Sequence, residues 1–189
     1  MVKEEEFLIA LDLSLACTGV TVFSLTTLKP VYIKSIVTKP KQSHGKQLYF
    51  IASELKKIKS TYNIKALAIE RGFNRYPTAT AALYKVHGVA LCVFHELKEK
   101  YYPPKTVKLA ILTGSSSKIA IRNRIELEYP DVVFANEDES DSFAVGLTYL
   151  IKEKNMKWVK SSRGKARKAT KKQTVTTIKK PKKTRDVVI

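Results

Sequence analysis

Four carboxylates of this chain end or interrupt apolar runs. Asp12 lies inside FLIALDLSLACTGVTVF, Glu70 ends KALAIE, and Asp138 and Asp141 lie near the start of EDESDSFAVGLTYL. A charge beside a core element is costly unless it has a partner. Clustered carboxylate oxygens are ligands that Mg²⁺ and Mn²⁺ prefer. The four acids are therefore candidate ligands of divalent cations.

Two such ions, held about 4 Å apart, activate a water molecule and stabilise the leaving oxygen of a phosphodiester. Each acid also has an ordinary structural interpretation. Asp12 fits a turn, although Asp is disfavoured inside a strand. Glu70 can pair with Arg71 on the surface.

Asp138 and Asp141 fit the first turn of a helix, where the helix dipole favours acids. Glu137 and Glu139 lie close enough in the sequence to be confused with them. Because Asp138 and Asp141 are three residues apart, they share one helix face. The ordered set of four acids, rather than any one of them, favours a metal-dependent hydrolytic site.

Apolar periodicity predicts the elements that position these acids. The expected strands span residues 7–13, 20–25, 31–38, 64–69, 107–112 and 132–135. The expected helices span residues 47–59, 77–100, 118–128 and 138–150. Three antiparallel strands followed by alternating helices and strands indicate an α/β fold, with helices on both faces of the sheet. Asp12 then lies within the first strand, and Glu70 ends a neighbouring one.

The charge is strongly positive and uneven. The 189 residues carry a net charge of +18, divided into +5 for residues 1–151 and +13 for residues 152–189. Such an excess indicates a nucleic acid partner. We expect residues 1–151 to form one domain and the basic tail, 152–189, to be disordered. The tail is interpreted as a DNA-binding arm; the alternative is a solubilising or targeting segment, since KKPKK resembles a nuclear localisation cluster.

The cellular location is inferred from the cysteines and from the termini. Cys17 and Cys92 lie in apolar runs without a CxxC pair, which fits buried thiols in a reducing compartment. The acidic start of the chain does not resemble a signal peptide, and no apolar run is long enough to span a membrane. We therefore expect a soluble, cytoplasmic protein with no membrane contact.

The acid set resembles that of the RuvC family of Holliday-junction resolvases, in the RNase H-like superfamily. The matching segments are LIALDLSLACTGVTVF, AIERGF with AALYKVHGVAL, TVKLAILTGSSSK and ESDSFAVGLTY, in family order over most of residues 7–150. The resemblance implies an RNase H-like mixed five-stranded sheet and a homodimer that nicks four-way DNA junctions symmetrically, in recombination or replication. It also implies two Mg²⁺ ions per site, with Mn²⁺ as a substitute, bound by Asp12, Glu70, Asp138 and Asp141.

Further residues match family positions with more specific roles. Phe73 matches an aromatic residue that pushes against bases at the junction centre; a core position is the alternative. Lys108 and Lys118 match lysines near the scissile phosphate, where a cation balances developing charge, with general solvation as the alternative. Arg71 and Arg75 flank Phe73 and are candidate phosphate contacts.

Two departures from the cellular enzymes resemble divergent RuvC-like nucleases of bacteriophages. Leu13-Ser14 follows the first Asp where the cellular enzymes have Pro-Gly, and the basic tail is long. A viral protein of this kind would act in the host cytoplasm. Some phage nucleases accept other branched DNA, so cleavage of forks or flaps is an alternative to strict four-way specificity.

Three other functions compete with junction cleavage. A nuclease of the same fold that cuts RNA–DNA hybrids needs the same acids. The wide apolar stripe of the expected 77–100 helix favours a dimer, and hence a junction. Actin-like ATPases share the D-x-[GS]-x-x-x-x-G pattern of residues 12–19 but need two such domains. A nonenzymatic DNA-binding protein would gain nothing from four acids that repel phosphates.

Overall fold

The computed structural model describes residues 4–72 and 76–160. Its strands are β1 (Phe7–Asp12), β2 (Cys17–Ser24), β3 (Pro30–Val37), β4 (Ile64–Glu70) and β5 (Glu99–Tyr102). Its helices are α1 (His44–Thr61), α2 (Pro77–Val93), α3 (Pro104–Ile111), α4 (Lys118–Glu128) and α5 (Glu137–Glu153). Among the described residues, no helix is both long enough and apolar enough to cross a membrane.

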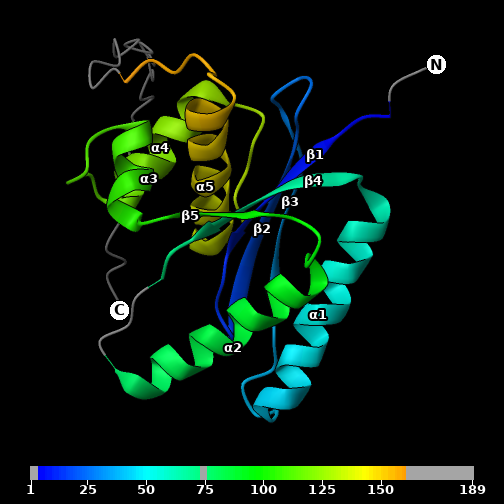
Figure 1. Ribbon diagram of the computed structural model, residues 1–189. Coiled ribbons are helices and arrows are strands. Elements are labelled where there is room, and N and C mark those ends of the chain that lie inside the picture. The colour runs from blue at the N-terminus through cyan, green and yellow to red at the C-terminus, as the bar shows by residue number, and fades with distance from the viewer. Residues whose placement is uncertain (1–3, 73–75, 161–189) are drawn as a thin grey trace, which may run out of the picture.

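The five strands form one mixed sheet in the order β3-β2-β1-β4-β5. The first three pair as an antiparallel meander, and β4 and β5 add in parallel beside β1. Figure 1 shows α1 and α2 on one side of this sheet and α3, α4 and α5 on the other. The predicted α/β architecture with a mixed five-stranded sheet is confirmed.

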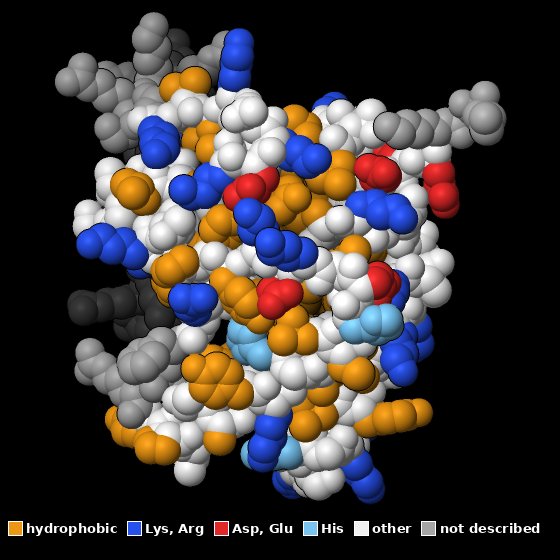
Figure 2. Space-filling model, viewed as in Figure 1, with side chains coloured by type: hydrophobic (Ala, Val, Ile, Leu, Met, Phe, Trp, Pro, Cys, Tyr) orange, Lys and Arg blue, Asp and Glu red, His pale blue; other side chains and the backbone are white. Residues whose placement is uncertain are grey.

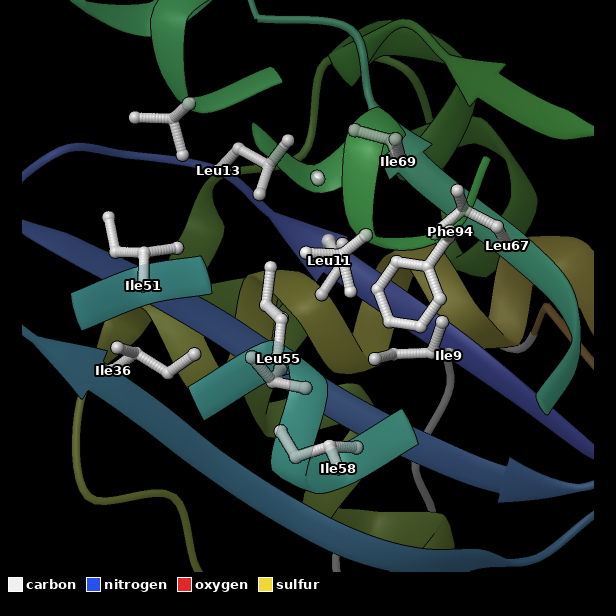
Figure 3. Packing of buried hydrophobic residues seen from close by; sticks show 14 of the residues in the cluster. Ile9, Leu11, Leu13, Ile36, Ile51, Leu55, Ile58, Leu67, Ile69 and Phe94 are labelled. Atoms are coloured by element: carbon white, nitrogen blue, oxygen red, sulfur yellow. The ribbon is translucent and has the colours of Figure 1, made fainter. Parts of the chain in front are cut away.

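Alternating side chains of β1 divide the core into two layers. Ile9 and Leu11 pack with apolar residues of α1 and α2, as Figure 3 shows. Leu8 and Ala10 point to the opposite face and pack with α3, α4 and α5. Because successive strand residues face opposite sides, each β1 position is assigned to one layer by its parity.

The region between residues 94 and 112 differs from the prediction. The expected strand at 107–112 is helical, because Pro103 and Pro104 begin α3 and its buried residues recur at helical spacing. The fifth strand is instead β5, which lies where the expected 77–100 helix was to end. That helix stops at Val93, and Leu97 belongs to a following turn that extends the apolar stripe.

The expected strand at 132–135 is also wrong. Only Phe134 of this segment is buried, where its ring packs edge-on against Phe143, and Val133 is exposed. The segment leads directly into the cap of α5 instead of joining the sheet. This short apolar run therefore contributes one buried aromatic ring to the core and does not form a strand.

Residues 152–160, expected within the tail, continue the fold. α5 extends to Glu153, and the Trp158 indole N–H donates to the carbonyl of Ile111 over 2.9 Å. The Arg124 guanidinium lies 4.9 Å from the centre of the Trp158 ring. The rest of the expected tail, residues 161–189, lies outside the described residues, so its disorder and the domain boundary stay predictions.

Candidate active site

Strand parity directs Asp12 and Glu70 to the same face of the sheet. Asp12 follows Ala10 by two residues on β1, and Glu70 follows Ala68 by two residues on β4. Both alanines belong to the core layer beneath α5. The two strands are parallel neighbours, so their last residues lie side by side at one edge of the sheet.

The beginning of α5 brings Asp138 and Asp141 to this edge. Asn136 caps the helix, since its side chain accepts a hydrogen bond from the Glu139 backbone N–H over 3.0 Å. Gly19, which pairs with Asp12 across β1 and β2, makes room for the helix. A Cβ atom on Gly19 would lie 1.9 Å from the Asp138 carbonyl oxygen.

The four acids act on one another electrostatically. Burial is the largest cause that raises the pKa of Asp12 to about 8, and the charges of Glu70, Asp141 and Asp138 contribute to this rise in that order. Burial also raises the pKa of Glu70 to about 7, with a second contribution from Asp141. Such a cluster gains stability from a positive partner, because each ionised acid opposes ionisation of the others.

Two lysines supply positive charge beside the cluster. Lys118, the first residue of α4, places its Nζ 2.5 Å from Asp141 Oδ2 and 3.8 Å from Glu137 Oε2. Ser117 caps α4, so the helix begins at Lys118. The charge of Lys108 on α3 offsets a small part of the rise that burial causes in the pKa of Glu70. Both predicted lysines therefore lie at the acids, while their catalytic roles stay predictions.

Of the other three predicted DNA contacts, the structure describes only Arg71. Arg71 follows β4, with its guanidinium 5.6 Å from the centre of the Tyr101 ring. Its backbone N–H donates to the Tyr102 carbonyl over 2.9 Å. Phe73 and Arg75 lie outside the described residues, so their proposed contacts with DNA stay predictions.

Glu137 and Glu139, the other acids at the beginning of α5, have partners of their own. Glu139 is buried and accepts hydrogen bonds from the Ala135 backbone N–H over 2.8 Å and from the Ser35 hydroxyl over 3.3 Å. Glu137 is exposed and faces Lys118. Glu139 thus ties the beginning of α5 to β3, which is a positioning role that the sequence did not reveal.

Cys17 lies against the acid cluster, which the interpretation of the cysteines as buried thiols in a reducing compartment did not anticipate. Its thiol is partly buried and hydrogen-bonds to the Asp138 carboxylate beside Ser35. Burial and this bond raise the pKa of the Cys17 thiol to about 12. The neutral thiol therefore acts as a donor that helps to hold Asp138.

The acids suit a divalent cation by their chemistry. Four carboxylates converge, and hard oxygen donors are the ligands of Mg²⁺ and Mn²⁺. Within residues 4–72 and 76–160, however, no group of three or more His, Cys, Asp or Glu side chains is arranged to hold a metal ion. The Lys118 ammonium instead neutralises Asp141. Joint coordination of an ion by these acids would therefore need their side chains to rotate.

Comparison with solved structures identifies the architecture. Thermus thermophilus RuvC in complex with a Holliday junction substrate superposes with a TM-score of 0.70 at 15% sequence identity, covering 79% of this chain and 96% of that one. A second structure of Thermus thermophilus RuvC gives a TM-score of 0.69 at the same identity and coverage. The fowlpox virus Holliday junction resolvase gives 0.49 at 15% identity.

No protein-family model and no curated protein matches the sequence. At 15% identity the structural likeness establishes the architecture, and it does so over nearly the whole length of the bacterial chain. This chain has the RuvC fold.

Proposed function

We propose that this chain is a divalent-metal-dependent DNA endonuclease that nicks four-way junctions symmetrically. The observation that carries the proposal is the convergence of Asp12, Glu70, Asp138 and Asp141 at one edge of a RuvC-type sheet, with Lys118 beside them. The bacterial protein of that fold was solved on a Holliday junction, which supports the choice of substrate.

Asp12, Glu70, Asp138 and Asp141 are the proposed ligands of two Mg²⁺ ions, for which Mn²⁺ can substitute. Metal held by these residues would supply an activated water molecule and a positive charge for the scissile phosphate. Gly19 and the Asn136 cap keep the beginning of α5 against the sheet, so the ligands start from a rigid frame. Rigid placement matters because small displacements of catalytic groups reduce rates strongly.

Lys118 changes partners in this proposal. Its ammonium is bound to Asp141 in this structure, and a metal ion held by Asp141 would free it. The released ammonium then faces the phosphate, where it offsets charge that develops on the nonbridging oxygens. Lys108 of α3, whose charge acts on Glu70, is proposed as a second cation for the same phosphate.

The substrate class is tested by incubating the full chain and Mg²⁺ with labelled four-way junctions, forks, flaps, RNA–DNA hybrids and linear duplexes. Preferred nicking of the four-way junction supports the proposal. Equal cleavage of forks and flaps supports a general branched-DNA nuclease instead. Preference for the hybrid supports the RNA-directed alternative, and binding without cleavage supports a nonenzymatic protein.

The exposed face of α2 is the proposed dimer interface. Leu83, Val86, Ala90 and Val93 are buried in the core of the chain, while Ala81, Tyr84, Gly88 and Cys92 are exposed on the other side. A Cβ atom on Gly88 would meet no atom within 4 Å, so packing within the chain does not require a glycine there. A second helix packed closely against Gly88 would require it.

Gly88→Leu is therefore expected to make the protein monomeric without unfolding it, because the new side chain meets only the partner helix. Light scattering after size exclusion measures the mass, and circular dichroism measures the fold. Ala81→Ser, a small change on the same face, is the control. A dimer that persists in Gly88→Leu places the interface elsewhere.

The tail is proposed to be a nonspecific DNA-binding arm. Residues 161–189 contain 11 Lys and Arg and one Asp. Phosphate contacts by such residues release counterions, so the contribution of the arm to affinity falls steeply with salt. The cytoplasmic location and the resemblance to bacteriophage enzymes stay predictions from the sequence.

A further inference from the structure

A groove lies between the end of β3 and the beginning of α1, apart from the acid cluster. It encloses about 470 Å³, and its lining includes Val37, Lys39, Gln42, Lys46, Tyr49 and Phe50. We call it the Tyr49 groove. The side chains of Tyr49, Val37 and Phe50 are unusually open for apolar residues, with 78%, 60% and 42% of their surface exposed.

The charged residues that line the Tyr49 groove are both lysines. Residues 13–53 contain five lysines and no Asp, Glu or Arg. Lys39 and Lys46 line the groove, and Lys41 lies exposed in the same loop. Figure 2 shows Lys and Arg side chains, but no Asp or Glu, at the lower end of the molecule, where α1 begins. The groove therefore suits a ligand that has both negative charge and flat apolar surfaces.

The wall of the groove is firmly built. The Thr38 hydroxyl donates to the Leu15 carbonyl over 2.7 Å. The buried Gln47 amide donates to Thr38 Oγ1 and to the Lys39 carbonyl, each over 3.1 Å. These bonds hold the loop before α1 in one shape, so Tyr49 projects from a rigid support.

The groove is also close to the acid cluster along the sheet. Val37 pairs with Cys17 across β3 and β2, and the Cys17 thiol contacts Asp138. The Thr38 backbone N–H donates to the Ala16 carbonyl over 2.9 Å. A strand of nucleic acid that passes the acids therefore reaches the Tyr49 groove within a few nucleotides.

We propose that the Tyr49 groove binds an unpaired DNA strand, with a base stacked on Tyr49 and flanking phosphates held by Lys39 and Lys46. An exposed aromatic ring beside lysines binds single strands in this way, because every base has an apolar face. Paired duplex bases are already stacked and present only their edges. The proposal deepens the proposed function, since unstacked bases occur where the arms of a branched DNA meet.

Binding of a 12-nucleotide single strand by the full chain, compared with the matching duplex, tests the proposal. Fluorescence anisotropy is measured at raised salt, which weakens contacts made by charge alone. Tyr49→Ala is expected to weaken single-strand binding about tenfold, and Tyr49→Phe to preserve it, because stacking needs the ring and not the hydroxyl. Leu127→Ala, an exposed apolar change on α4, is the control and is expected to leave binding unchanged.

Single-turnover cleavage of a four-way junction at saturating protein separates this proposal from the proposed function. If the wild type does not cleave but Tyr49→Ala loses single-strand affinity, the proposed function fails and the groove stands. Equal affinity of Tyr49→Ala and wild type for the single strand overturns the groove. The proposal is also overturned if the wild type binds the duplex as tightly as the single strand. It is overturned as well if the mass of the protein in solution shows that the groove binds a second copy of the chain.

Discussion

Replacing Asp12 by Asn is expected to lower Mg²⁺-dependent junction cleavage by about a thousandfold or more. Metal ions contribute several kcal/mol of charge stabilisation, and each 1.4 kcal/mol or so is tenfold in rate. The charges of the other three acids all act on Asp12, so we propose Asp12 as the central ligand of the site. Asp131→Asn, an exposed change before α5, is the matched control and is expected to cleave normally. Single-turnover rates measure both variants.

The same variant is expected to flatten the pH dependence of stability in metal-free protein. The pKa of Asp12 is 3.8 in its ordinary state and about 8 in the fold, so the folded state retains a proton that the unfolded state loses. Stability from this group is complete below pH 4 and is lost as the pH rises towards 8. The slope reaches at most about 1.4 kcal/mol per pH unit.

Thermal unfolding in EDTA between pH 5 and pH 9 measures this slope. The wild type is expected to lose stability with rising pH more steeply than Asp12→Asn. Added Mg²⁺ is expected to raise the wild-type Tm more at pH 8 than at pH 6, because protons compete with metal for the acids. Equal slopes for the two proteins, or Mg²⁺ stabilisation that falls with pH, would contradict a metal site at Asp12.

Gly19→Ala is expected to reduce both stability and cleavage. The new Cβ atom would lie 1.9 Å from the Asp138 carbonyl oxygen and 3.2 Å from Ser142 Cβ, so α5 must move away from β2. Forcing extra volume into a packed interface costs about 1–3 kcal/mol. The movement also carries Asp138 away from Asp12, so the apparent affinity for Mg²⁺ falls as well.

Gly45→Ala is the matched control, because a Cβ atom there meets nothing within 4 Å and the residue lies in the first turn of α1. Urea unfolding and an Mg²⁺ titration of cleavage are compared for the two variants. Gly45→Ala is expected to match the wild type or to be slightly more stable. If Gly19→Ala keeps wild-type stability and Mg²⁺ dependence, the close approach of α5 does not position the acids.

Local rules predict the strands and the helix that carry the four acids, but the pairing of β1 with β4 and the approach of α5 to Gly19 bring these elements together. Alternation along β1 gives the face of the sheet on which Asp12 lies, and the end of an apolar strand marks Glu70. The helix that carries Asp138 and Asp141 has a recognisable cap and acidic first turn. These features need no knowledge of long-range contacts.

Other parts of the molecule depend on contacts between distant segments, which local patterns do not encode. The run at 107–112 suits a strand or a helix, and the proline pair and the packing of α3 on α5 select the helix. The short strand β5 has too little apolar character to stand out, and only its place beside β4 makes it a strand. Cys17 and Glu139 support the site through partners that lie far from them in the sequence.

The most direct test of the central claim is cleavage of a four-way junction labelled on all strands, by the wild type and by Glu70→Gln, with and without Mg²⁺. Paired nicks at symmetric positions by the wild type alone, only with Mg²⁺, and junction binding retained by Glu70→Gln, are the predicted result. Cleavage by Glu70→Gln at the wild-type rate, or wild-type cleavage in EDTA, would contradict a metal-dependent nuclease built on these acids.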